Sequence, residues 1–390
     1  MNPNKPSLGC ILQEHGDEFI KMFCCLLTMY QIKAIKKTLE CLTFRSGYRS
    51  YYCPDCGRLK RIPFSCKSSL CPKCSARYTK THAMDFVSKM LNVTHRHIVF
   101  TIPDALWDIF HGNERLQKGL LQAAYAPIVE TMKIYLHEEV MPGVLNVLHN
   151  YGRDLKKNCH VHAITSEGGR NKKGEWCKFN YFPYEKKGRI WITINEIWEN
   201  KVLELLLKEY KNSPWIMGIV EDIRKRYPNG FYVYGPGKNR IKTNQGAYKK
   251  ARYIMRYIRH PVISDSRIES YDGENVVFWY EQPSTQKRVY IKLEVMVFIQ
   301  RVVQHIMPKG FHVCVRYGLY SSRYIGKGEV QMIFRSDGKV INPKHISWRE
   351  SIYWHTAKDP LICEHCNEEM IHVCTVYRCR GGGRYHISYR

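Results

Sequence analysis

Two Cys-x-x-Cys motifs constrain the fold of this 390-residue chain more than any other feature. They are Cys53-Pro-Asp-Cys56 and Cys71-Pro-Lys-Cys74, with fourteen residues between them. Tetrahedral zinc takes four thiolates at about 2.3 Å, and two such motifs can supply them. Proline and charged residues inside the motifs argue against four unligated core thiols. We therefore predict that Cys53, Cys56, Cys71 and Cys74 bind one structural Zn²⁺.

Other cysteines leave the full ligand set open. Cys66 lies between the two motifs and is a fifth candidate ligand. A second group near the C-terminus comprises Cys363, Cys366, Cys374 and Cys379, which either bind another zinc or are ordinary thiols. Basic side chains surround the first motifs, and from these we predict that Lys67 and Lys73 contact nucleic acid.

The charge of the chain predicts a polyanionic partner. Lys and Arg outnumber Asp and Glu by 61 to 35, which gives a formal net charge of +26. Phosphate contacts dominate nucleic-acid affinity, so a nucleic acid fits better than an anionic membrane. No apolar run reaches the roughly 18 residues that span a bilayer, and the first ten residues lack the apolar core of a signal peptide. We expect a cytoplasmic protein whose sixteen cysteines serve metal sites rather than disulfides.

A His-x-His pattern indicates a metal site in the middle of the chain. Residues 159–165 read Cys-His-Val-His-Ala-Ile-Thr, which is typical of a strand. Side chains alternate along a strand, so His160 and His162 face one side and can share a divalent ion, while Val161 faces the core. His149 ends the preceding strand, where it either completes the metal shell or is a partly exposed histidine. The pattern His95-Arg-His97 has the same spacing, but its charged middle residue favours a structural or DNA-facing role.

A predicted helix over residues 245–259 carries two candidate nucleophiles. Tyr253 and Tyr257 are four residues apart and therefore lie on one face. A tyrosine hydroxyl can attack a phosphodiester and hold the cut DNA as a phosphotyrosine. Lys250 shares this face, and we predict that Lys250 and Arg256 contact DNA. Packing alone would also explain such a tyrosine pair in a chain with 27 tyrosines.

Several motifs, in this order, resemble the two-tyrosine HUH transposases of the insertion-sequence-ninety-one type. The matching stretches span roughly residues 40–320. They are Cys53-Pro-Asp-Cys-Gly57, Ser65-Cys-Lys67, Cys71-Pro-Lys-Cys74, His97-Ile-Val-Phe-Thr-Ile-Pro103, Tyr151-Gly-Arg-Asp-Leu155, His160-Val-His162, Glu167-Gly-Gly169, Tyr253-Ile-Met-Arg-Tyr257, Tyr271-Asp-Gly273 and Arg316-Tyr-Gly-Leu319.

The resemblance implies an α+β fold, with an antiparallel-sheet HUH endonuclease core backed by helices and preceded by a small zinc-ribbon-like domain. We expect an N-terminal helical segment over 1–45, a zinc-binding domain over 46–90, a nuclease domain over 91–320 and a C-terminal extension over 321–390. His160 and His162 would hold catalytic Mg²⁺ or Mn²⁺. Tyr253 and Tyr257 would be the nucleophiles that cut single-stranded DNA at transposon ends, in a bacterial cytoplasm at the nucleoid.

Three other functions fit part of the sequence. A plasmid or phage rolling-circle replication initiator uses the same chemistry, although the zinc segment before the nuclease favours a transposase. A zinc-containing DNA- or RNA-binding regulator without catalysis accounts for the charge and the cysteines, but not for the histidine and tyrosine patterns. A metal-dependent hydrolase that activates water would cut DNA without a covalent intermediate.

Overall fold

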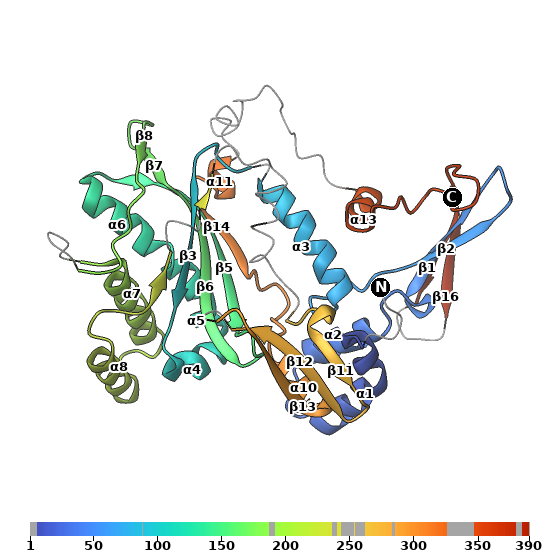
Figure 1. Cartoon of the computed structure of the whole chain (residues 1–390), viewed down its shortest axis with the longest axis horizontal. Coiled ribbons are helices and arrows are strands. Elements are labelled where there is room, and N and C mark those ends of the chain that lie inside the picture. The colour runs from blue at the N-terminus through green and yellow to red at the C-terminus, as the bar shows by residue number, and fades with distance from the viewer. Residues whose placement is uncertain are drawn as a thin grey trace.

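The architecture described below is that of a computed structural model of the whole chain (Figure 1). The description covers residues 6–87, 89–186, 192–235, 240–242, 253, 262–282, 285–325, 347–379 and 384–389. The predicted helix over 245–259 lies outside these residues except for Tyr253, which is helical.

An antiparallel sheet forms the centre of the molecule, as the resemblance implied. In the described part of the chain it has six strands in the order β10-β3-β6-β5-β14, with β9 also paired to β3. The strands are β3 (His95–Thr101), β5 (Gly143–Tyr151), β6 (Lys157–Ser166), β9 (Val233–Tyr234), β10 (Arg240–Ile241) and β14 (Cys314–Gly318). The sequence predicts a hairpin-like pair of strands over 144–149 and 160–165, and these strands are β5 and β6. Their side chains alternate between two faces, which have different coverings.

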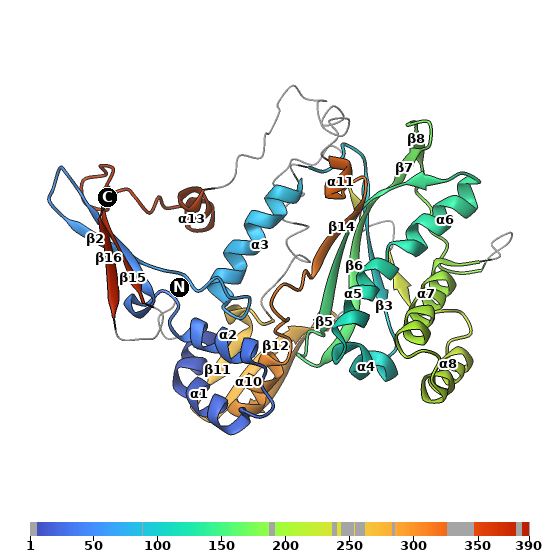
Figure 2. The same cartoon turned by 180° about the vertical axis from the view of Figure 1, so that it is seen from behind.

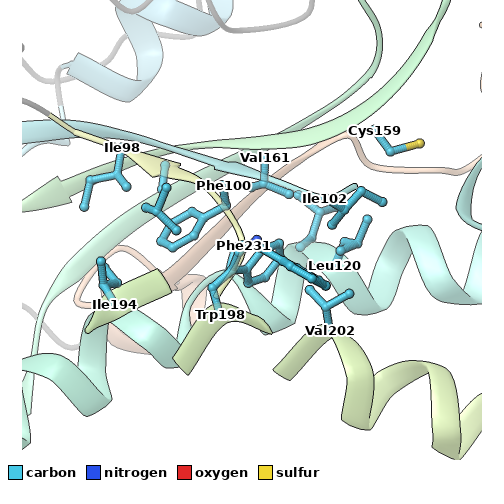
Figure 3. Close-up of a cluster of buried hydrophobic side chains, with 14 of the residues drawn as sticks. Ile98, Phe100, Ile102, Leu120, Cys159, Val161, Ile194, Trp198, Val202 and Phe231 are labelled. Atoms are coloured by element: carbon cyan, nitrogen blue, oxygen red, sulfur yellow. The ribbon is translucent and has the colours of Figure 1, made fainter. Parts of the chain in front are cut away.

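Helices cover the first face and bury its apolar side chains (Figure 3). Phe100, Val161 and Trp198 meet in this cluster, and the Trp198 indole donates to the Thr101 carbonyl at 2.6 Å. The helical elements on this side are η2 (Asp104–Leu106), α4 (Trp107–His111), α5 (Glu114–Ala123), α6 (Ala126–Leu136), α7 (Ile194–Glu209) and α8 (Pro214–Arg226).

The structure adds detail to one sequence prediction in this region and corrects another. The sequence of residues 114–139 predicts a helical stretch, and the structure divides it into α5 and α6, with Pro127 in the first turn of α6. Proline suits the start of a helix but removes a hydrogen bond from its middle. The mixed pattern of residues 214–244 predicts a loop-rich stretch, which is wrong at its start, because α8 begins at Pro214, directly after Ser213. The Ser-Pro pair was the missed start signal.

Helix α3 (Pro72–Val87) covers one end of the second face. Its Ala83 and Phe86 pack with Leu145, Val147 and Ile164 from β5 and β6. Tyr320 joins this cluster ahead of the short helix α11 (Ser322–Ile325). The other end of the same face carries the histidines described below.

The N-terminal helices pack on a second unit, which contains a three-stranded sheet (Figure 2). Phe19, Phe278 and Phe298 lie in its buried cluster. The elements are α1 (Leu8–Phe23), α2 (Met29–Leu39), η3 (Asp265–Arg267), β11 (Ile268–Tyr271), β12 (Asn275–Glu281), β13 (Arg288–Glu294) and α10 (Val295–Val303). The sequence of residues 15–42 predicts two short helices or one bent helix, and the structure has two helices here, α1 and α2. Their buried side chains pack against β11, β12 and α10, which lie within the segment predicted as the nuclease domain.

A third sheet combines the two ends of the chain. Its order is β16-β15-β1-β2, so C-terminal strands lie beside those of the predicted zinc-binding segment (Figure 1). The elements are η1 (Phe44–Ser46), β1 (Gly47–Tyr52), β2 (Leu59–Pro63), α13 (Trp348–Thr356), β15 (Ile371–Arg378) and β16 (Tyr385–Tyr389). Within the segment predicted as a C-terminal extension, β15 and β16 thus belong to this sheet. A small sheet of β4 (Val140–Met141), β7 (Gly168–Asn171) and β8 (Trp176–Lys178) completes the described strands.

A buried ion pair anchors β3 on the helix-covered side. The Arg96 guanidinium lies 2.9 Å from the Glu167 carboxylate, and both side chains are only 5% exposed. Arg96 also donates to the carbonyl of Asn180. The positive charge of Arg96 argued against a metal site at His95-Arg-His97. In the structure, Glu167 neutralises this charge on the face of β3 opposite to His95 and His97.

Breaking this pair should destabilise the protein strongly. Arg96→Met removes the guanidinium that neutralises the buried Glu167 carboxylate, and removing one partner of a buried ion pair typically costs about 3–5 kcal/mol. Lys118→Met is the matched control, because it breaks a pair with Glu114 whose side chains are 57% and 42% exposed. Exposed pairs contribute about 0–1 kcal/mol. Equal losses in the free energy of unfolding in urea, for the two variants, would contradict this assignment.

Candidate metal and nucleophile site

Strand pairing places three histidines at one end of the second face of the central sheet. His160 and His162 alternate with Val161 on β6, and Val161 lies in the helix-covered cluster. His149 on β5 is directly paired with His160 in the antiparallel register. The three imidazoles therefore project from two adjacent strands toward the same side.

The three side chains are close enough to share one ion. One ring nitrogen from each lies within 4.8 Å of the others, and all three residues are half-buried. The ring centroids of His149 and His162 are 4.4 Å apart, and those of His160 and His162 are 4.9 Å apart. Of the alternatives for His149, the structure thus favours the position that completes a metal shell.

The backbone orients His160 for metal binding. Its Nδ1 lies 2.9 Å from the carbonyl oxygen of Asn158, which can only accept a hydrogen bond. The proton therefore resides on Nδ1, and Nε2 keeps its lone pair for a ligand. Burial lowers the pKa of His160, and the hydrogen bond to Asn158 opposes this effect. A neutral imidazole is the form that binds metals.

His97 supports His162 from the neighbouring strand β3, a contact that the sequence analysis missed. Nε2 of His97 lies 2.9 Å from Nδ1 of His162. Burial is the main reason that the pKa of His97 is lowered to about 3, with the charge of His160 as a smaller cause. Nε2 of a neutral His97 can accept a hydrogen bond from Nδ1–H of His162, which leaves Nε2 of His162 for an ion. The His97 side chain is only 2% exposed, so it does not face DNA. The His-x-His spacing of His95-Arg-His97 was the sequence signal that could have identified His97 as part of the site.

Tyr253 approaches the histidines through His97. The ring centroids of Tyr253 and His97 are 6.0 Å apart in an edge-to-face arrangement. Its ring is partly buried against the cluster that contains Val147 and Ile164, on the same face as His162. The other residues that we assigned to this helix, namely Tyr257, Lys250 and Arg256, lie outside the described residues.

The expected four-cysteine zinc site is divided in the structure. Cys71 and Cys74 group with Cys41 and Cys66, whereas Cys53 and Cys56 lie in a different group with C-terminal cysteines. The combination of Cys53, Cys56, Cys71 and Cys74 around one ion was therefore wrong. The two cysteines of each Cys-x-x-Cys motif stay together, but each motif is completed by two cysteines from outside the other motif.

The first cysteine group has the dimensions of a zinc site. Sγ of Cys41 lies 3.5 Å from Sγ of Cys74 and 3.6 Å from Sγ of Cys71. A tetrahedron with zinc–sulfur bonds of about 2.3 Å has edges of about 3.8 Å. Cys41 lies just after α2 and is not part of a Cys-x-x-Cys motif. The sequence therefore offers no reason to choose Cys41 as a ligand over the other isolated cysteines. Lys67 and Lys73 are exposed beside this group.

Comparison with known proteins identifies two family models in the chain. The model described as a transposase zinc-binding domain matches residues 11–102, and the model described as a putative transposase matches residues 143–326. The first match includes Cys41, Cys66, Cys71 and Cys74. The second includes Tyr253 and the cluster of His149, His160 and His162.

Two curated relatives agree with these matches. A transposase for insertion sequence element IS801 from Pseudomonas savastanoi pv. phaseolicola is 27% identical over 76% of this chain and 72% of its own length. A putative transposase from Sinorhizobium fredii is 25% identical over 82% of this chain and 81% of its own length. No solved structure matches the chain significantly.

Together these findings define a transposase with an N-terminal zinc-binding domain. The chain belongs to the transposases of the insertion-sequence-ninety-one type. Membership implies DNA binding and DNA strand transfer, and the cysteine groups fit structural Zn²⁺. Among the helices of the described residues, none combines the length and apolarity needed to cross a membrane.

We expect the histidine cluster to bind one Mn²⁺ ion per chain. His162→Ala should abolish this binding in calorimetric titration, and His97→Ala should weaken it by about 10- to 100-fold, because it removes the group that orients His162. His386→Ala is the control, since His386 is exposed on β16. Unchanged affinity in His162→Ala would contradict the assignment of the cluster as a metal site.

Proposed function

We propose that this transposase nicks single-stranded DNA at transposon ends through a 5′-phosphotyrosine and then transfers the strand by a rolling-circle route. The observation that carries the proposal is the joint placement of Tyr253 and the three histidines on one face of the central sheet. The Tyr253 ring contacts His97, and His97 is bonded to His162. A nucleophile and a metal cluster separated by one side chain can act on a shared phosphate.

The donor set supports a transition ion at the histidine cluster. Three imidazole nitrogens fall within 4.8 Å of one another. Imidazole-rich sites hold transition ions more tightly than Mg²⁺, which prefers oxygen ligands. Of the two expected ions, we therefore favour Mn²⁺ over Mg²⁺. When bound, such an ion would polarise the scissile phosphate and offset charge on its non-bridging oxygens.

Nicking requires one bond to form at phosphorus and one to break. The phenolic oxygen of Tyr253 or Tyr257 attacks the phosphate and loses its proton to solvent. The bond from phosphorus to the 3′ oxygen breaks, and that oxygen takes up a proton. The products are a 5′-phosphotyrosine and a free 3′-OH. Attack by another 3′-OH reverses this chemistry, restores the tyrosine and joins the strand, so no ATP is consumed.

Basic side chains would hold the DNA backbone near both metal regions. Lys67 and Lys73 are exposed beside the first cysteine group, in a chain with a net charge of +26. On the tyrosine helix, Lys250 and Arg256 would contact the phosphates of the cut strand, and Lys250 would favour the ionised form of a neighbouring tyrosine. Such contacts position DNA without reading its sequence.

The relatives favour transposition over the other functions considered. Both are described as transposases, and neither as a replication initiator or regulator. A regulator without catalysis gives no reason for a histidine cluster beside a tyrosine. A hydrolase that activates water would need the cluster but not the tyrosine. Formation of a covalent adduct distinguishes the proposed chemistry from both of these.

The decisive assay uses single-stranded oligonucleotides from the ends of the element, labelled at either the 3′ or the 5′ end, with Mn²⁺. We expect 3′-labelled DNA to migrate with the protein on denaturing gels, because the 5′-phosphate side stays on tyrosine. The 5′-labelled fragment should be released. Tyr253→Phe with Tyr257→Phe should lose the adduct, whereas Tyr290→Phe, at an exposed tyrosine of β13, should retain it.

Two results would overturn the proposal. Cleavage without any adduct would indicate attack by water, as in a hydrolase. An adduct that persists in the double tyrosine variant would place the nucleophile elsewhere in the chain.

A further inference from the structure

Four cysteines from the two ends of the chain form a second sulfur cluster. Cys53 and Cys56 come from the segment after β1, and Cys363 and Cys366 come from the segment before β15. Sγ of Cys53 lies 3.3 Å from Sγ of Cys366, and Sγ of Cys56 lies 3.6 Å from Sγ of Cys363. The zinc-binding family model ends at residue 102, so it contains only half of this group.

The two cysteine loops have the same backbone conformation. In the first, the Gly57 N–H donates to the Cys53 carbonyl at 3.0 Å, and the Cys53 N–H donates to the Arg58 carbonyl at 2.9 Å. In the second, the Asn367 N–H donates to the Cys363 carbonyl at 3.0 Å, and the Cys363 N–H donates to the Glu368 carbonyl at 2.9 Å.

Each loop also turns at a left-handed residue directly after its second cysteine. Gly57 has φ of 70° and Asn367 has φ of 61°, and glycine and asparagine are the residues that adopt this conformation most readily. Two unrelated segments thus form the same turn, and in each the turn brings two sulfurs to one side. Equivalent loops that face each other present four ligands, as a tetrahedral ion requires.

The sulfur distances fit a bound ion better than disulfides. A disulfide bond is about 2.05 Å long, whereas zinc–sulfur bonds of about 2.3 Å give sulfur–sulfur edges of about 3.8 Å. The apolar cluster around these sulfurs is small: its buried members are Tyr51, Cys53, Cys363 and Met370. A core of this size gives little stability to a sheet, and small domains of this kind commonly depend on a metal.

We propose that Cys53, Cys56, Cys363 and Cys366 bind a second structural Zn²⁺, separate from the ion at Cys41, Cys66, Cys71 and Cys74. This ion fastens the C-terminal segment to the N-terminal sheet. Its position supports this role, because Tyr52 at the end of β1 pairs with Ile371 at the start of β15. The ion therefore sits where the two strands meet and holds their register, independently of the histidine site.

Zinc content per chain tests the proposal. It is measured by plasma mass spectrometry on the full chain in a His160→Ala, His162→Ala background, so that the histidine cluster contributes none. We expect two zinc ions per chain, one for each cysteine group. Cys363→Ser with Cys366→Ser should retain one. The control, Cys374→Ser with Cys379→Ser, changes two cysteines of the same segment outside both groups and should retain two.

Hydrogen exchange on the same variants provides a second measurement. Loss of the ion at Cys363 and Cys366 should increase exchange in β15 while leaving the β5–β6 pair protected, which also shows that the variant is folded. One zinc ion in the parent chain would overturn the proposal. Two ions retained in Cys363→Ser, Cys366→Ser, or a disulfide among these four cysteines in the parent chain, would overturn it equally.

Discussion

The in-register antiparallel pairing of β3, β6 and β5 is the constraint on which the histidine cluster depends. Because side chains alternate, the register that buries Phe100 and Val161 under the helices also turns His160 and His162 to the opposite face. A shift of one residue would exchange the two sets. Hydrophobic burial on one side of the sheet therefore fixes the positions of the imidazoles on the other.

The supporting contacts restrict each imidazole further. The carbonyl of Asn158 fixes the tautomer of His160, and His97 lies against His162. Burial lowers the pKa of His97 to about 3, so it remains neutral and its Nε2 can accept a hydrogen bond from Nδ1–H of His162. Ligands on rigid strands with oriented partners require little reorganisation when an ion binds. Tyr253 packs on the same face of the sheet and contacts His97 with its ring.

The sequence predicts those helices and strands whose formation depends on the periodicity of neighbouring side chains. Alternation predicts the strand around His160, and helical periodicity predicts a long helix over 195–211, which the structure has as α7. Cys41 was not predictable, since its partners Cys66, Cys71 and Cys74 are defined only by the folded chain. For the same reason, the sequence did not reveal that the two Cys-x-x-Cys motifs belong to different cysteine groups. Pairing between β1 and β15 joins segments more than 300 residues apart, and no spacing rule reports such a contact.

The most direct test of the central claim is the separation between the metal cluster and the proposed nucleophile. Mn²⁺ bound to the full chain, with 3-fluorotyrosine at position 253, permits ¹⁹F electron–nuclear double resonance. A resolved dipolar coupling that disappears in His160→Ala, His162→Ala would agree with a tyrosine beside a histidine-bound ion. A tightly bound Mn²⁺ that shows no coupling to the fluorine at position 253, with or without single-stranded DNA, would contradict it.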